Sequence, residues 1–332
     1  MSDTFDLYKK KTIKHLAENV LSRIDVVNSS GLYNGKAGIA IGLFEAAKFL
    51  NDTSIEDKAF RLFQESLIIK NRDLSFENGL PGIGYTLLYM IENEFIETDF
   101  IEIFEEEYEL IIKRYIEIEK EPSRLLSSFK AIYFFRKAVE ITKDDRIKKI
   151  IRKFFEGLEL YLAIHFLDFS DKLYINNKFF VLKVYEQYLR LIDFTTYTDF
   201  SKLVMDSYSQ LYKKGKISSN YFTGFFLENI TNGNNEYADI IQQNKQYGLL
   251  AFHSDSLFLN EQIDLLCCIY KDKCNEKETI TKAVEKEWIN LLPKNPWDII
   301  YFRIPSNSQN IGYGFGLSRL LTFVTNKNHC FV

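Results

Sequence analysis

Apolar residues recur at helical spacing along the chain, and the segments that carry them come in pairs. In the first pair, an apolar stripe runs from Ile39 to Leu50 at intervals of three and four positions. Residues 54–67 follow with one apolar face and one charged face, and Ser54 with Asp57 offers a cap at their start. This pattern predicts two helices, the first of them apolar and the second amphipathic.

Signals for the start and end of helices also appear further along the chain. Residues 142–145 read as a helix cap ahead of the apolar positions from Ile147 to Phe154. Residues 199–214 read as a helix that ends at Gly215. No sustained alternation of apolar and polar residues is bounded by hairpin turns. The sequence therefore predicts an all-α protein.

A glycine-rich phrase divides these pairs. Gly35-Lys36-Ala37-Gly38-Ile39 returns 44 positions later as Gly79-Leu80-Pro81-Gly82-Ile83, and Gly312-Tyr313-Gly314-Phe315 is a partial third copy. Five steps of 46 residues span the 230 positions from Gly82 to Gly312, which predicts six or seven repeats. With seven, their centres lie near residues 38, 82, 128, 174, 220, 266 and 312. Repeated helix pairs stack into a solenoid or close into a ring, and the likeness of the first and last copies favours a single closed domain over residues 1–332.

Composition narrows the class of protein. The 332 residues are 46% hydrophobic and 27% charged with a net charge of −4, which is typical of a soluble globular protein and argues against a general nucleic-acid binder. No apolar run reaches about 18 residues, so no membrane span is expected. The N-terminus lacks the apolar core of a signal peptide, and the 4 cysteines are too few for a disulfide framework. We therefore expect a cytoplasmic protein with reduced thiols.

The glycine-rich segments resemble those of a known family. Residues 32–39, 75–85 and 311–320 are similar to repeats of the lanthionine synthetase C-like proteins, and the last resembles the closing repeat of that family. The resemblance implies an α/α toroid, in which inner and outer helices form a double ring. It also implies work in the modification of ribosomally made, lanthipeptide-type peptides. The expected partner is a precursor peptide or a peptide-modifying enzyme.

The zinc chemistry of the family is where this sequence departs from it. The resemblance implies a zinc held by a Cys from one repeat and an adjacent Cys-His pair from the next, because zinc lowers the pKa of a substrate thiol. No Cys lies at the loop-to-helix junctions just before the glycine phrases, and no Cys-His-Gly occurs. Cys267 and Cys268 fall inside a predicted helix. We therefore predict no metal site, no cofactor and no zinc-dependent cyclase activity. A relocated zinc site drawn from Cys267, Cys274, His329 and Cys330 is an alternative.

Catalytic candidates are few. His253 and Asp255 lie close together before a predicted inner helix. Neighbours in sequence do not converge on one point as the residues of a catalytic triad do. We therefore favour a helix cap as the interpretation of this segment. A second alternative is a glycosidase or lyase on an α/α toroid, with Glu77 and Asp255 as paired lumen carboxylates.

Substrate-binding residues are expected at the predicted mouths of the inner helices, where tyrosine and amide side chains suit a peptide. These candidates are Tyr33, Asn34, Glu77, Asn78 and Asn310.

Overall fold

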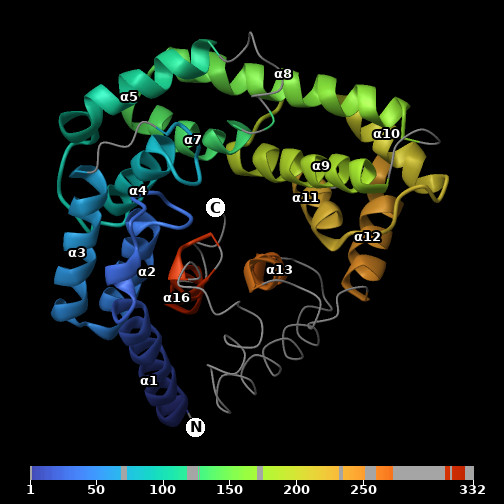
Figure 1. Ribbon diagram of the computed structural model, residues 1–332. Coiled ribbons are helices and arrows are strands. Elements are labelled where there is room, and N and C mark those ends of the chain that lie inside the picture. Colours follow the sequence, from blue (N-terminus) through green and yellow to red (C-terminus); the bar gives the residue numbers. More distant parts are fainter. Residues whose placement is uncertain are drawn as a thin grey trace. The chain divides into compact units, whose positions relative to one another are not determined.

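The computed structural model describes residues 2–68, 73–117, 126, 128–169, 175–231, 235–250, 259–271, 311–314 and 316–325. Their regular structure is helical, and no strand occurs within these ranges, which confirms the all-α prediction (Figure 1). None of the helices described is both long enough and apolar enough to cross a membrane.

The chain divides into two compact units. The first comprises the described residues of 1–111 and 257–332, and the second those of 112–256. The boundary falls within α5 (Phe100–Glu117). Whether the chain closes into a ring and whether it forms a single domain both depend on how the two units are joined. Both therefore stay predictions.

The first unit is built around one apolar helix. Its elements are α1 (Ser2–Leu21), η1 (Ile24–Val26), α2 (Lys36–Leu50), α3 (Thr53–Ile68), α4 (Leu80–Glu92), α13 (Leu259–Lys271) and α16 (Leu317–Thr325). Helix α2 packs against α1, α3, α4 and α16, and every residue from Ala37 to Ala47 is buried. Helix α3 buries one face only. The predicted contrast between an apolar helix and its amphipathic partner is confirmed for this pair.

The second unit repeats this alternation. Its elements are η3 (Phe129–Ala131), α7 (Ile132–Thr142), α8 (Asp145–Leu167), α9 (Ile175–Thr195), α10 (Lys202–Lys213), α11 (Tyr221–Thr231), η4 (Asn235–Tyr237) and α12 (Ala238–Leu250). Helix α9 packs against α7 and α11, while α8 packs against α7, α9 and α10. Gly215 follows α10 with φ of 65°, the left-handed conformation that its predicted role as a helix stop requires.

The structure has a helix near each predicted repeat centre. Within the described ranges, a helical segment begins near or spans each of the seven predicted positions, at α2, α4, η3 with α7, α9, α11, α13 and α16. In the first unit these helices pack side by side in the order α13, α16, α2 and α4, and in the second in the order α7, α9 and α11. The last described helix therefore lies beside the first glycine-phrase helix, as Figure 1 shows for α16 and α2.

Candidate functional site

The three glycine-rich segments meet in the first unit. We call residues 31–35, 75–79 and 311–314 the glycine junction. The backbone N–H of Tyr33 donates to the carbonyl of Glu77 at 2.7 Å, and the N–H of Gly314 donates to the carbonyl of Tyr33 at 3.0 Å. The first segment is thus hydrogen-bonded to both of the others, so residues nearly 280 positions apart in the chain share one small region.

Glycine is required here because backbones approach too closely for a side chain. A Cβ atom on Gly312 would lie 2.0 Å from the carbonyl oxygen of Tyr33, and one on Gly31 would lie 2.4 Å from the Cα of Asn78. Both contacts are with backbone, which cannot move aside as a flexible side chain could. The glycine phrases therefore allow the three segments to touch.

Four of the predicted substrate-binding residues lie on this junction. Tyr33, Asn34, Glu77 and Asn78 are each half-buried. The ring of Tyr33 packs edge-on against Phe76, with 6.3 Å between the ring centroids. The structure thus brings these four side chains to one place, and their role in binding stays a prediction.

The structure does not describe the other candidates. Asn310, His253 and Asp255 lie outside the described residues. Glu77 is therefore placed, but its proposed partner carboxylate is not.

A buried carboxylate connects the helices that leave the junction. Glu45 of α2 is 4% exposed and accepts a hydrogen bond from the hydroxyl of Tyr89 on α4. Burial raises the pKa of Tyr89 far above its usual value of 10.0, and the neighbouring Glu45 carboxylate and the Tyr313 phenol raise it further. Tyr89 therefore keeps its proton and acts as a hydrogen-bond donor. This hydrogen bond offsets the free-energy cost of burying the Glu45 carboxylate.

The described residues do not fit the zinc site that the resemblance implies. Cys267 and Cys268 are buried within α13, as predicted, and adjacent residues on a helix point in directions about 100° apart. Across the ranges given above, no group of three or more His, Cys, Asp or Glu side chains could hold a metal ion. Cys274, His329 and Cys330 lie outside those ranges.

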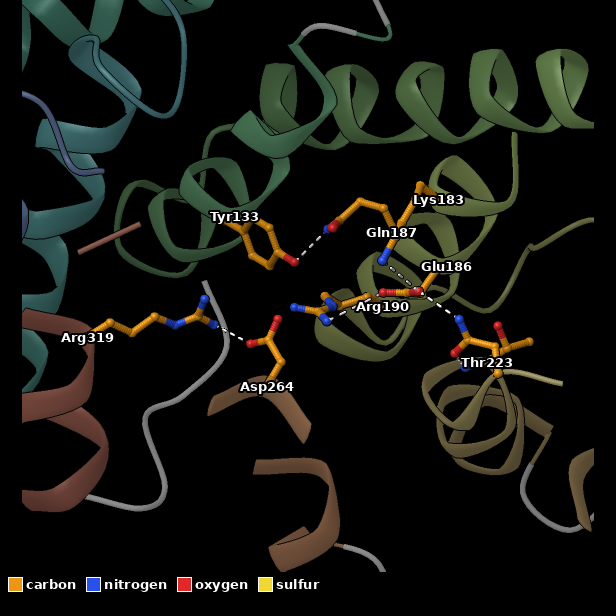
Figure 2. Close-up of polar contacts among 9 residues, drawn as sticks. Tyr133, Lys183, Glu186, Gln187, Arg190, Thr223, Asp264 and Arg319 are labelled. Atoms are coloured by element: carbon orange, nitrogen blue, oxygen red, sulfur yellow. Dashed lines mark hydrogen bonds and ion pairs between the residues drawn. The ribbon is translucent and has the colours of Figure 1, made fainter. Parts of the chain in front are cut away.

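A second group of polar side chains lies in the other unit, and sequence reasoning missed it. We call it the α9 cluster, and Figure 2 shows five of its members, which are Lys183, Glu186, Gln187 and Arg190 of α9 and Tyr133 of α7. The sixth member is Asn220, just before α11. The Nδ2 of Asn220 donates to Glu186 at 3.2 Å, and the Nε2 of Gln187 donates to the Tyr133 hydroxyl at 2.8 Å. The available signal was the row of charges at positions 183, 186 and 190, spaced three and four residues apart within this helix.

One ion pair in the first unit is also buried. Arg319 of α16 forms a hydrogen-bonded salt bridge with Asp264 of α13 (Figure 2). The residue exposures are 5% and 8%. This pair joins two neighbouring helices of the same unit and serves as a comparison for the α9 cluster.

Comparison with known proteins gives a match that covers part of the glycine junction. The model of the family described as lanthionine synthetase C-like protein matches residues 2–154, which include two of the three junction segments. No curated protein matches the chain. Residues 2–154 are therefore similar to lanthionine synthetase C-like proteins.

Proposed function

We propose that the protein acts in the modification of ribosomally made, lanthipeptide-type peptides and binds a precursor peptide at the glycine junction. The similarity of residues 2–154 to lanthionine synthetase C-like proteins supports the pathway. The observation that carries the binding site is the grouping of Tyr33, Asn34, Glu77 and Asn78 on two hydrogen-bonded segments of the junction. The protein binds its peptide without adding a zinc-activated thiol to it.

The chemistry of the junction suits recognition of a peptide backbone. The side-chain amides of Asn34 and Asn78 each offer both a donor and an acceptor, which matches the alternation of N–H and C=O along an extended peptide. The Tyr33 ring adds apolar area with a hydroxyl at its end. None of the junction residues is a cysteine or histidine, so none of them supplies a thiolate or a metal-ligating imidazole.

Binding is tested with a synthetic precursor peptide encoded beside the gene. We expect the double variant Asn34→Ala/Asn78→Ala to bind the fluorescently labelled peptide roughly tenfold more weakly in an anisotropy titration, because about two neutral hydrogen bonds are lost. Gln64→Ala, on the exposed face of α3, is the matched control and should bind as the unmodified protein does. Equal affinity for all three proteins would refute the site. If a co-expressed modifying enzyme binds and the peptide does not, the protein is instead a partner subunit.

Metal analysis separates this proposal from the cyclase alternative. Protein purified without a histidine tag should contain well below about one zinc per chain. Incubation with a dehydrated precursor should leave the peptide thiols open to alkylation, as counted by mass spectrometry. Stoichiometric zinc together with loss of alkylatable thiols would establish a relocated cyclase site.

A further inference from the structure

Helix α8 ends in an exposed apolar stripe. Leu160, Ile164 and Leu167 are spaced four and three positions apart, so they lie on one face of the helix. All three are exposed, and Leu167 is 81% exposed. Single exposed apolar residues are ordinary on a soluble protein, but a contiguous row of large ones marks a surface that contacts another body.

The start of α9 extends this surface. Phe179 and Phe180 are exposed, and Phe179 is 64% exposed. Helices α8 and α9 pack together in the second unit (Figure 1), and the Nζ of Lys178 lies 5.5 Å from the ring centroid of Phe169, just after α8. The start of α9 therefore lies beside the end of α8. We call the five exposed apolar residues the apolar hairpin end; they are Leu160, Ile164, Leu167, Phe179 and Phe180.

Positive charge flanks the apolar hairpin end on both helices. Lys149 and Lys153 continue the stripe of α8 toward its start at helical spacing, and both are exposed. On α9, Lys178 is half-buried, and the Nζ of Lys183 lies 5.8 Å from the ring centroid of Phe179. Lysine can lay its aliphatic stem along such apolar side chains and keep its ammonium in water.

Negative charge is sparse on the same surface. Within the described residues of 149–180, the exposed carboxylates are Glu156 and Asp168. Glu156 is paired with Arg152 at 2.9 Å, so these two charges offset each other. The face is therefore positive, although the chain as a whole carries a net charge of −4. Such a protein meets an anionic surface through its positive face, because the remainder is repelled.

We propose that the apolar hairpin end inserts into the surface of an anionic lipid bilayer, with Lys149, Lys153 and Lys178 at the lipid headgroups. Leucine, isoleucine and phenylalanine gain free energy at the boundary of the acyl chains, and lysines add attraction to anionic lipids. Protein-binding hot spots are instead rich in Trp, Tyr and Arg and poor in Leu. The outer face of a helix is also convex, and a fluid bilayer adapts to it, whereas a bound peptide helix needs a groove.

Vesicles test this proposal without any protein partner. The full chain is sedimented with vesicles of phosphatidylcholine mixed with phosphatidylglycerol, and with vesicles of phosphatidylcholine alone. We expect clear binding to the mixed vesicles, binding at least about tenfold weaker to the neutral ones, and release from the mixed vesicles as salt is added. The Phe179→Trp variant should show a shift of tryptophan emission to shorter wavelength with mixed vesicles, whereas Ile103→Trp on α5 should not.

Variants assign the binding to the hairpin. Leu167→Gln/Phe179→Gln should weaken binding to mixed vesicles at least about tenfold, because apolar area no longer enters the bilayer. Lys149→Gln/Lys153→Gln should weaken it about tenfold through lost attraction to the headgroups. The matched controls lie in the first unit and should bind as the unmodified protein does; they are Ile103→Gln on α5 and Lys10→Gln/Lys14→Gln on α1, all exposed positions. Because every changed side chain is exposed, urea midpoints should stay close to that of the unmodified protein.

Several outcomes would overturn the proposal. They are no binding to mixed vesicles, equal binding to both kinds of vesicle, or full binding by Leu167→Gln/Phe179→Gln. If the protein ignores vesicles but forms a dimer that this variant abolishes, the surface serves a second copy of the chain instead. Failure of the precursor peptide to bind at the glycine junction would leave these measurements unaffected, so the two proposals can fail separately.

Discussion

At the scale of single residues, two glycines serve different purposes, and substitution should distinguish them. A Cβ atom on Gly312 would clash with the backbone of Tyr33 and Asn34, whereas one on Gly215 would meet no atom within 4 Å. Gly215 is constrained only by its φ of 65°. We expect Gly312→Ala to lower the free energy of unfolding by about 3 kcal/mol and Gly215→Ala by about 1 kcal/mol. Urea denaturation measures both, and equal losses would contradict the close packing of the junction.

Buried phenols make stability depend on pH in the alkaline range. Burial, more than any neighbouring group, raises the pKa of Tyr89, Tyr185 and Tyr188 above the usual value of 10.0. In the unfolded chain these phenols lose their protons near pH 10, whereas the folded protein retains them. Their contribution to stability is therefore complete below about pH 10 and declines as the pH rises further.

This pH dependence can be measured directly. Urea midpoints should stay constant up to about pH 9 and fall as the pH rises above about 10. Phenolate absorbance should show a fraction of the tyrosines ionising only when the protein unfolds. If every tyrosine titrates in the folded protein with an ordinary pKa, the burial described here is wrong.

At the scale of helices, the start of α8 shows how one side chain can define an element. The carboxylate of Asp144 accepts a hydrogen bond from the backbone N–H of Arg146 at 2.8 Å, as the sequence-predicted cap requires. We expect Asp144→Ala to lower the free energy of unfolding by about 1 kcal/mol. Asp145→Ala is the matched control, because the neighbouring Asp145 is exposed and pairs only with Lys148 on the surface. A control that destabilises as much as Asp144→Ala would rule out the capping explanation.

Helices were predictable because their signals are local. The cap at Asp144 and the stop at Gly215 each depend on a few adjacent residues, and the apolar repeat located α2 and α3. The sequence also indicated Tyr33, Asn34, Glu77 and Asn78, since each lies just before a glycine phrase, but their role in binding stays a prediction. The α9 cluster was not predicted, because Tyr133 joins it from α7 and Asn220 joins it from the position before α11, through contacts that no local pattern encodes.

At the scale of the whole molecule, the ends of the sequence complete one core. Helix α16 packs against α1 and α2, and a Cβ atom on Gly42 of α2 would lie 2.6 Å from the carbonyl oxygen of Ser318. Deleting residues 311–332 would therefore expose an apolar face of α2. We expect the truncated protein to lose the cooperative unfolding of its first unit and to be cut by trypsin within residues 1–111. Unchanged urea unfolding and protease resistance would show that α16 is dispensable.

The packing of α16 on α2 also sets an order for synthesis in the cell. Helix α2 leaves the ribosome long before α16, the helix that covers it. At translation rates of roughly 5–20 residues per second, the nascent chain carries an uncovered apolar helix for roughly tens of seconds. The first unit can therefore complete its core only after α16 has been made, and the exposed segment is a natural client for chaperones that shield nascent chains.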